Sequence, residues 1–255
     1  METDLSITPD VNDGCHYFAT FEDHPFDEGQ CRHAYKGVLH GFGPRDRTAC
    51  VTKVFKDEYA MQTRIWIPDV KASKTAKCYA DEFMRLHQVN LQNYIGYNTI
   101  EFVVPIIANM KKVTPQINLI KVGEVVGIEP FIFGDYTKFN TNGGYENGDY
   151  QLMTAFCHWT YHKSGGSHMV CDLQGVKSGN RYILTDPVIH SSEKEYGSTD
   201  FGIESMEKVL ANHQCNVLCQ YLGLHNPMVG SGIPPGPMTT VYRFQVTEQN
   251  MLTYQ

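Results

Sequence analysis

Residues 168–187, HMVCDLQGVKSGNRYILTDP, contain two runs of apolar or β-branched residues, and an aspartate follows each run. The acids are Asp172 and Asp186, and Gln174 lies two positions after the first. Runs of this length bounded by Gly, Asn and Pro are typical of β-strands. A carboxylate and an amide oxygen are ligands of the kind that Mg²⁺ takes beside nucleotide phosphates, and a second carboxylate can orient a hydroxyl or take its proton. The alternative is a pair of ordinary turn aspartates, because Asp186-Pro187 is a common turn opener.

The composition narrows the class of protein. The chain has 255 residues, of which 42% are hydrophobic, and a formal net charge of −7. It has no cluster of five or more Lys and Arg, which argues against a nucleic-acid binder. The acidic, polar N-terminus predicts no signal peptide, and the apolar runs are too short to span a bilayer. We therefore expect a cytosolic protein that does not insert into membranes, whose eight cysteines are thiols or metal ligands.

The pattern of apolar residues predicts strands at 49–55 and 61–67, within 100–111 and 117–134, and in the two runs of 168–187. Helices are expected at 74–93, at about 150–163, and at 203–222 before Gly223. Turn residues fill 135–148, and the C-terminal part is rich in Gly and Pro. Strands with one helix, then a turn-rich segment, then a mixed half indicate an α+β fold of two lobes with a cleft between them.

Residues 213–219, HQCNVLC, carry three candidate metal ligands. On a helix, Cys215 and Cys219 would share one face, whereas His213 would join them only where the backbone is irregular. These nitrogen and sulfur ligands suit Zn²⁺, which takes four in a tetrahedron, and a site with four protein ligands is structural. His158 is the best fourth ligand and Cys157 its competitor. The alternative is that both cysteines are core residues and His213 lies on the surface.

Three further residues suit a nucleotide site. Lys53 lies inside a strand, where it either points toward phosphates or lies at a solvated edge. Arg32 can serve the same phosphates. Glu129 follows an apolar strand and precedes the turn-rich segment, a suitable place for a hinge that receives adenine. The acid that pairs with Lys53 is not identified by the sequence, although Asp81 and Glu82 lie on the predicted helix.

Taken together, eight segments resemble the catalytic domain of the alpha-kinases, the atypical Ser/Thr protein kinases that include myosin heavy chain kinases, elongation factor 2 kinase and the kinase domains of TRP channels. They occur in family order over residues 25–224: PFDEGQCRHAYKG, VTKVF, IEPFIFGDYTKFNTNGG, AFCHWTY, VCDLQGV, LTDPVIHS, YGSTDFG and HQCNVLCQYLGL. Each segment alone is a weak signal, whereas eight in order are specific. Two departures are Thr52, where the family usually has Ala, and GSGIPPG, which matches the family's glycine-rich segment only loosely.

The resemblance implies a bilobal protein-kinase-like fold with a zinc-stapled C-lobe, and it gives roles to individual residues. Asp172 matches the catalytic acid/base, and Gln174 and Asp186 match the magnesium ligands. The remaining matches, by position, are to the ATP phosphates (Lys53, Arg32), to adenine (Glu129), to the nearby loop that touches nucleotide or substrate (Lys138, Asn140), to a polar position of the catalytic loop (Asp200), and to the zinc ligands (His158, His213, Cys215, Cys219).

The implied function is transfer of the γ-phosphate of Mg-ATP to Ser or, preferentially, Thr of a protein substrate, with autophosphorylation as a further outcome. The expected organisation is a partly ordered leader at 1–24, a catalytic domain at 25–225 with lobes at about 25–128 and 129–225, and a Gly/Pro-rich segment at 226–255. The alternative is an inactive, zinc-stabilised pseudokinase scaffold that binds a partner. A Cys/His hydrolase is a poor third hypothesis, because no cysteine has an evident orienting pair.

Overall fold

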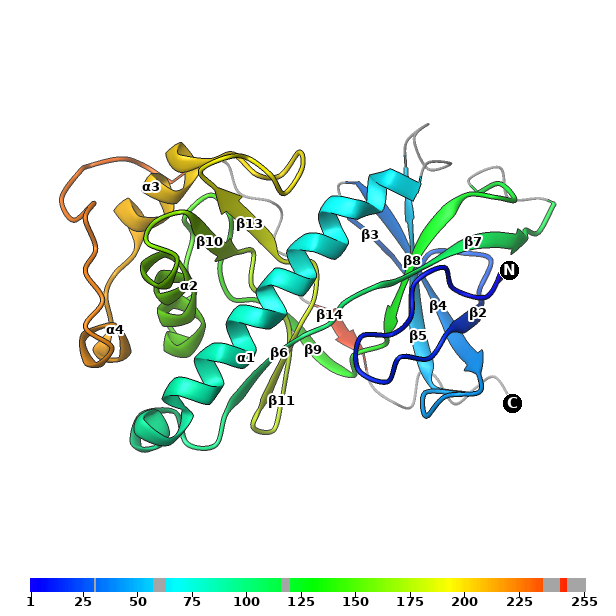
Figure 1. Ribbon diagram of the computed structural model, residues 1–255, viewed down its shortest axis with the longest axis horizontal. Coiled ribbons are helices and arrows are strands. Elements are labelled where there is room, and N and C mark those ends of the chain that lie inside the picture. The colour runs from blue at the N-terminus through cyan, green and yellow to red at the C-terminus, as the bar shows by residue number, and fades with distance from the viewer. Residues whose placement is uncertain (30, 57–62, 116–119, 236–243, 247–255) are drawn as a thin grey trace. The chain divides into compact units, whose positions relative to one another are not determined.

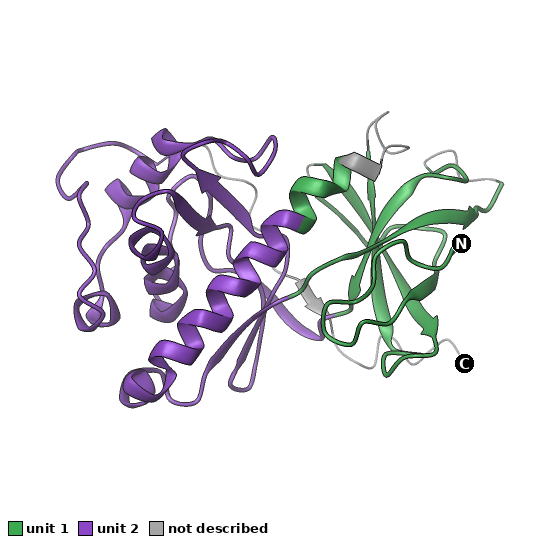
Figure 2. Ribbon diagram, viewed as in Figure 1, with its two compact units in different colours: residues 1–70, 103–131 green, residues 71–102, 132–255 purple. Residues whose placement is uncertain are grey.

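The computed structural model describes residues 1–29, 31–56, 63–115, 120–235 and 244–246. The chain forms two compact units (Figure 2). Unit 1 comprises residues 1–70 and 103–131, and unit 2 comprises residues 71–102 and 132–255. Among the described residues, no helix combines the length and the apolar character that a bilayer crossing requires. The described chain contains both sheets and helices, so the predicted α+β class is confirmed.

Unit 1 is an antiparallel sheet that closes on itself (Figure 1). The strand order is β2-β1-β7-β8-β5-β4-β3, and β2 also pairs with β4, so six strands form a ring to which β3 is added. Tyr17, Leu39, Val54 and Ile106 are fully buried in its core. The strands are β1 (Glu2–Thr3), β2 (Tyr17–Phe21), β3 (Asp27–Glu28), β4 (Arg32–Gly41), β5 (Ala49–Phe55), β7 (Ile106–Lys112) and β8 (Val125–Pro130).

The first 24 residues differ from the expected leader, because they supply β1 and β2 to this ring. Tyr17, Ala19 and Phe21 alternate inward along β2, and the first two are fully buried. This alternation buries apolar side chains on one face of the strand despite the acidic, polar residues before it.

The segment predicted as a strand at 61–67 has another structure where it is described. Residues Thr63–Trp66 form a 3-10 turn, helix α1 (Ile67–Ile95) begins directly after it, and residues 61 and 62 lie outside the described part of the chain. Pro68 suits the first turn of a helix, since its φ is fixed near the helical value and its missing N–H is not needed there. Trp66 is buried and its indole nitrogen donates to the carbonyl of Val125 at 3.0 Å. A Cβ on Gly127 would lie 2.5 Å from this indole, so only glycine fits opposite it.

In its described residues, unit 2 contains the larger part of α1, two sheets and three more helices (Figure 1). The five-stranded sheet has the order β14-β9-β11-β12-β6, with β6 parallel to β12, and β10 pairs with β13. The strands are β6 (Thr99–Phe102), β9 (Gly134–Lys138), β10 (His168–Cys171), β11 (Gln174–Ser178), β12 (Arg181–Leu184), β13 (Val188–Ser191) and β14 (Phe244–Val246). The helices are α2 (Gln151–Lys163), α3 (Ile203–Asn212) and α4 (Val217–Tyr221).

The core of unit 2 is formed by α1 and α2 against the sheets. Phe83 of α1 contacts Phe156 and Trp159 of α2 edge-on, with ring centroids 5.5 and 5.0 Å apart. The buried positions Ala76, Ala80 and Phe83 recur every three or four residues, which is the spacing that predicted the helix. The helices expected at 74–93 and at about 150–163 are confirmed.

The single helix predicted over 203–222 is wrong in one respect. The structure has two helices, α3 and α4, separated by residues 213–216. His213 ends α3 in an extended conformation (φ −73°, ψ 125°), and the side chain of Asn216 caps α4 by accepting from the N–H groups of Leu218 and Cys219. An asparagine at this position satisfies N–H groups that have no partner inside the helix, so it starts a new helix rather than continuing the old one.

Candidate active site and metal site

Lys53 and Glu129 form a buried ion pair in unit 1. The ammonium nitrogen lies 2.7 Å from Oε2 of Glu129. In the ladder between β5 and β8, Lys53 is opposite Gly127 and Val51 is opposite Glu129, so the two side chains are diagonal neighbours on one face. Glu129 is therefore an acidic partner of Lys53 that the sequence did not identify. Of the acids on α1, Asp81 pairs with Lys77, and Glu82 lies 2.8 Å from Lys163.

Arg32 shares this face of the sheet. It is opposite Phe55 in the β4–β5 ladder, in which Lys53 is opposite Ala34, so Arg32 and Lys53 are also diagonal neighbours. Its guanidinium lies 2.9 Å from Asp69 and 5.4 Å from the ring centroids of both Phe55 and Trp66. The sheet of unit 1 thus brings together the two cations predicted for ATP phosphates, and Glu129 beside them.

Asp172 lies at the end of β10 in unit 2, where it is only 6% exposed. One carboxylate oxygen is 2.9 Å from the ammonium of Lys138. Burial raises the pKa of Asp172, and the nearby Asp186 raises it further, whereas Lys138 and the main-chain N–H of Asn142 lower it. The net shift is upward. Asp172 also has a positive φ of 55°, a left-handed conformation that aspartate tolerates better than most residues.

Asn140 fixes the chain next to this carboxylate. Its Oδ1 accepts a hydrogen bond from the main-chain nitrogen of Leu173 at 2.8 Å. Within the described part of the chain, its buried Nδ2 has no hydrogen-bond partner. Buried donors are rarely left unpaired in native proteins, so this nitrogen suits a bound polar ligand.

Gln174 and Asp186, the two residues that match magnesium ligands by resemblance, lie near each other. The side-chain nitrogen of Gln174 donates to the main-chain oxygen of Asp186 at 3.3 Å, which orients the amide. Gln174 is opposite Lys138 in the β11–β9 ladder, so the amide and the lysine share a face. At the next position, a Cβ on Gly175 would lie 2.1 Å from the carbonyl oxygen of Ile183, so glycine alone fits there. An amide oxygen and a carboxylate are oxygen donors of the kind that Mg²⁺ takes in proteins.

Asp200 holds main-chain groups together. Its carboxylate accepts hydrogen bonds from the main-chain nitrogens of Ser191 at 2.8 Å, Gly202 at 3.0 Å and Tyr196 at 3.2 Å, and from the hydroxyl of Ser191. The residue predicted at a polar position of the catalytic loop is thus buried and fastens the end of β13 to the start of α3.

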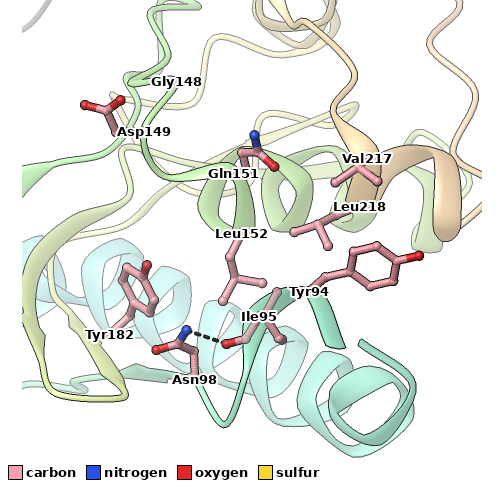
Figure 3. Close-up of a pocket in the computed structure, with 10 residues that line it drawn as sticks. All are labelled: Tyr94, Ile95, Asn98, Gly148, Asp149, Gln151, Leu152, Tyr182, Val217 and Leu218. Atoms are coloured by element: carbon pink, nitrogen blue, oxygen red, sulfur yellow. Dashed lines mark hydrogen bonds between the residues drawn. The ribbon is translucent and has the colours of Figure 1, made fainter. Parts of the chain in front are cut away.

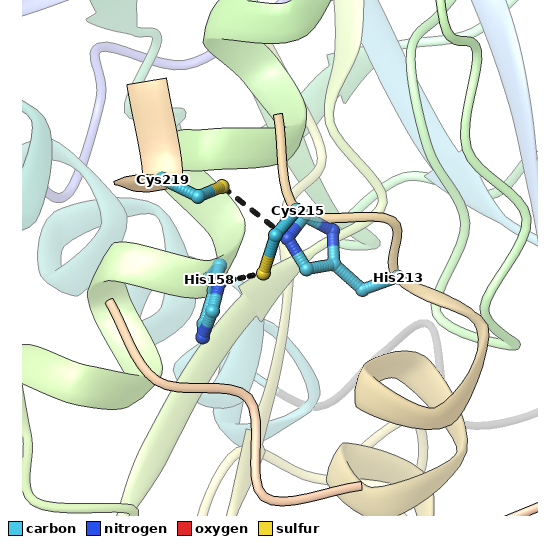
Figure 4. A group of neighbouring side chains, drawn as sticks. All are labelled: His158, His213, Cys215 and Cys219. Atoms are coloured by element: carbon cyan, nitrogen blue, oxygen red, sulfur yellow. Dashed lines mark hydrogen bonds between the residues drawn. The ribbon is translucent and has the colours of Figure 1, made fainter. Parts of the chain in front are cut away.

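His158, His213, Cys215 and Cys219 converge, with one ligand atom of each within 4.8 Å of all the others (Figure 4). Nδ1 of His158 is 3.7 Å from the sulfur of Cys215, and Nε2 of His213 is 3.3 Å from the sulfur of Cys219. Zinc–nitrogen and zinc–sulfur bonds of about 2.0 and 2.3 Å place neighbouring N and S ligands about 3.5 Å apart on a tetrahedron. The extended backbone at His213 lets it join both cysteines, which a continuous helix would prevent. The competitor Cys157 instead lies 3.8 Å from Cys171.

The two histidines of this cluster are oriented by groups that the sequence did not reveal. Nδ1 of His213 is 2.7 Å from a carboxylate oxygen of Glu146, and Nε2 of His158 is 3.2 Å from the carbonyl oxygen of His225. A proton on each outer nitrogen leaves the inner nitrogen free to bind a metal, an arrangement found around most metal-binding histidines. The donor set therefore fits a structural Zn²⁺.

A pocket of about 400 Å³ lies elsewhere in unit 2, and no predicted site residue lines it (Figure 3). Its walls come from the ends of α1, α2 and α4 and from β12. The lining residues are Tyr94, Ile95, Asn98, Gly148, Asp149, Gln151, Leu152, Tyr182, Val217 and Leu218.

Comparison with known proteins gives the chain its relatives. The sequence profile described as "Alpha-kinase family" matches residues 27–219. Alpha-protein kinase vwkA of Dictyostelium discoideum is 31% identical over 207 residues, which cover 80% of this chain and 31% of that protein. Alpha-protein kinase 1 of the same organism is 34% identical over 225 residues, 85% of this chain and 15% of that protein. The chain thus spans less than a third of the length of these relatives.

The fold is similar to solved structures of alpha-kinase domains. The crystal structure of the alpha-kinase domain of myosin-II heavy chain kinase A in complex with AMP-PNP superimposes with a TM-score of 0.70 at 23% identity, covering 89% of this chain and 97% of that one. The apoenzyme of that domain gives a TM-score of 0.68. The kinase-like α+β fold expected from the sequence is confirmed by this likeness. The chain belongs to the alpha-kinase family.

Proposed function

We propose that this chain is a protein kinase that transfers the γ-phosphate of Mg-ATP to a Ser or, preferentially, Thr hydroxyl of a protein substrate. One observation carries the proposal: Asp172, buried beside Lys138, lies near Asp186, whose main chain holds the amide of Gln174. In this arrangement Asp172 would be the base for the acceptor hydroxyl, and it lies near Gln174 and Asp186 as oxygen ligands for a metal. Membership of the alpha-kinase family supports the same reaction.

The residues of unit 1 are proposed to bind the phosphates of ATP. Lys53 and Arg32 supply positive charge from one face of the sheet, and Glu129 orients Lys53 through their 2.7 Å ion pair. Glu129 also keeps its proposed place near adenine, since it ends the apolar part of β8. Cations held in place before the substrate arrives stabilise developing charge without having to reorganise.

Asp172 is proposed as the catalytic acid/base. Its ionised carboxylate accepts a hydrogen bond from the acceptor hydroxyl and takes its proton as the new oxygen–phosphorus bond forms. Lys138 stabilises the ionised form that this role requires. Asn140 holds the main chain at Leu173 in place and offers its unpaired Nδ2 to the nucleotide. Asp200 keeps the loop after β13 in its conformation.

Two metals are proposed. Gln174 and Asp186 would hold Mg²⁺, which when bound neutralises phosphate charge. His158, His213, Cys215 and Cys219 would hold Zn²⁺, which would stabilise the fold by joining α2 to α4 and to the segment between α3 and α4.

The partner is proposed to be a protein with an accessible Ser or Thr, which includes a second copy of this chain in autophosphorylation. A cytosolic location and the absence of nucleic-acid binding remain predictions from the composition. The rival is a pseudokinase scaffold that binds a partner and transfers nothing.

The test compares wild type, Asp172→Asn and Asp149→Asn in transfer of labelled γ-phosphate to the protein itself and to a Thr-containing peptide. Asp149 is an exposed acid of the same unit outside the proposed site, so Asp149→Asn should behave as wild type. Asp172→Asn should lose at least about 100-fold in kcat and still bind ATP by calorimetry. If the folded, zinc-loaded wild type binds ATP but transfers no phosphate, the scaffold replaces the kinase.

A further inference from the structure

Glu146 is a shielded carboxylate that contacts one of the four converging metal ligands. Its side chain is 12% exposed and that of His213 is 1% exposed. Nδ1 of His213 donates to Oε1 of Glu146 across 2.7 Å. Hydrogen bonds to a carboxylate are stronger than those between neutral groups, and water has little access to this one. The contact therefore anchors Glu146 to the metal cluster.

The main chain of Glu146 is in turn paired with Asn140. The two residues face each other in an isolated antiparallel bridge. Next to this pair, the main-chain N–H of Asn147 donates to the carbonyl of Phe139 at 2.8 Å. Residues 139–147 thus fold back on themselves, and a contact that fixes one arm of this loop at Glu146 also fixes the other arm at Asn140.

The other arm of the 139–147 loop holds both main-chain groups of Leu173. The N–H of Phe139 donates to the carbonyl of Leu173 at 2.8 Å. In return, the N–H of Leu173 donates to Oδ1 of Asn140, also at 2.8 Å. Phe139, Asn140 and Leu173 are all buried, so the two bonds are protected from competition with water.

Leu173 links two side chains of the proposed active site. It lies between Asp172 and Gln174, so the position of its main chain sets where both side chains begin. Asp172 has a positive φ of 55°. A residue with a side chain keeps this left-handed conformation only where the surrounding contacts hold it. The two hydrogen bonds of Leu173 are contacts of this kind.

We propose that Glu146 is a positioning residue for this segment. It fastens the 139–147 loop to His213, and the loop in turn holds Leu173. The metal cluster thereby steadies the backbone at Asp172. Glu146 is not a catalytic residue, because its described contacts reach this segment through the main chain of the loop. The consequence for catalysis rests on the proposed kinase function, whereas the effect on Leu173 does not.

Two substitutions of Glu146 test the hydrogen bond to His213. Glu146→Gln keeps an oxygen that accepts from Nδ1, whereas Glu146→Ala removes the acceptor. Glu207→Ala is the control for loss of a carboxylate, since Glu207 is exposed on α3 of the same unit. All variants are full chains in excess Zn²⁺, and zinc content with near-ultraviolet circular dichroism identifies those that have folded.

Amide hydrogen exchange, followed by NMR, measures local opening at Leu173 directly. In Glu146→Ala the Leu173 amide should exchange at least about tenfold faster than in wild type, because a hydrogen bond to a carboxylate is lost from its support. The amide of Phe83, in the core of α1, should keep its wild-type rate. Glu146→Gln and Glu207→Ala should leave both rates unchanged.

A double variant tests whether the effect passes through Asn140. Asn140→Ala removes the acceptor of the Leu173 amide itself and should speed its exchange. Adding Glu146→Ala should then speed it by less than the product of the two single effects, because both substitutions act on one bond. A full product would show that Glu146 does not act through Asn140, which contradicts the proposal.

In the transfer assay, Glu146→Ala should lose at least about tenfold in kcat through misplacement of Asp172, and Glu146→Gln should restore most of it. A wild type that transfers no phosphate would overturn only the kinase function, because the exchange rates still decide the role of Glu146. Equal Leu173 exchange in wild type and folded Glu146→Ala overturns that role. So does exchange that rises equally at Leu173 and Phe83, since Glu146 would then serve only the overall stability of unit 2.

Discussion

The ammonium nitrogen of Lys53 lies 2.7 Å from Oε2 of Glu129, and the two side chains are 11% and 4% exposed. The pair joins β5 to β8, two neighbouring strands in the ring of unit 1. At this depth, water screens neither charge effectively. Removing one member therefore leaves the other charged, buried and uncompensated.

Glu129→Gln should lower the free energy of unfolding by about 3 kcal/mol, since breaking a buried ion pair costs about 3–5 kcal/mol. It should also weaken ATP binding, because Lys53 loses the group that orients it. Glu101→Gln is the control: Glu101 pairs with Arg181 at side-chain exposures of 42% and 58%, and an exposed pair contributes at most about 1 kcal/mol. Urea denaturation measures the free energy of unfolding of both variants. Equal losses in the two variants would show that the Lys53–Glu129 pair is no more important to stability than a surface contact.

Asp186→Asn should lower phosphate transfer at least about 100-fold, because the Lewis-acid contribution of a bound metal is worth several kcal/mol. The amide binds Mg²⁺ less tightly than the carboxylate, so the Mg²⁺ concentration for half-maximal rate should rise. Asp135→Asn, at an exposed acid on β9, provides the comparison. An unchanged Mg²⁺ dependence in Asp186→Asn would remove this residue from the proposed metal site.

The acid limb of the pH profile should report Asp172. Its pKa is raised above the ordinary aspartate value by burial, so the ionised base is lost at a higher pH than for an exposed aspartate. The value of kcat/KM, which follows the free enzyme, should therefore fall as pH drops through this raised pKa and not rise. A profile that stays flat down to the ordinary aspartate range, in a protein shown to remain folded, would contradict the role of Asp172 as the base.

Cys219→Ser should abolish zinc binding and lower the melting temperature, because a structural zinc contributes directly to folding free energy. Atomic absorption on wild type should find about one zinc per chain. Cys50→Ser alters another fully buried cysteine, in the core of unit 1, and should retain the metal whatever its effect on stability. Zinc content that survives in Cys219→Ser, with an unchanged melting temperature, would exclude this cluster as the metal site.

The strand at 49–55 and the helices at 74–93 and 150–163 could be predicted because their apolar residues repeat with the period of one element. The segment 61–67 could not, since TRIWI alternates like a strand while Trp66 is buried against Gly127 in a turn. Residues 1–24 could not be predicted as strands because the acidic residues in this segment outnumber the inward-facing positions of β2. A break between α3 and α4 was considered only as the irregular backbone that would let His213 join the two cysteines, and the backbone at His213 is irregular in this way.

The predicted ligands and acids came from local motifs, whereas their supporting partners did not. Glu129 was assigned to adenine, and its pairing with Lys53 depends on the register of two strands that are 76 positions apart at these residues. Glu146 is 67 positions from His213. No motif marks such pairs in a single sequence. The one available signal was that Glu146 lies next to a segment already assigned to the site.

Each unit is built from two separate stretches of the chain, so the strands of one unit leave the ribosome at different times during synthesis. The ring of unit 1 lacks β7 and β8 until residue 130 has left the ribosome, although β2, β4 and β5 are complete by residue 55. Most of helix α1, and β6, are made in between and belong to unit 2, and β6 pairs in its sheet only once β12 is complete at residue 184. Nascent chains stopped within 56–124 therefore expose strand edges of the unfinished ring, and this is where a holding chaperone would be needed most.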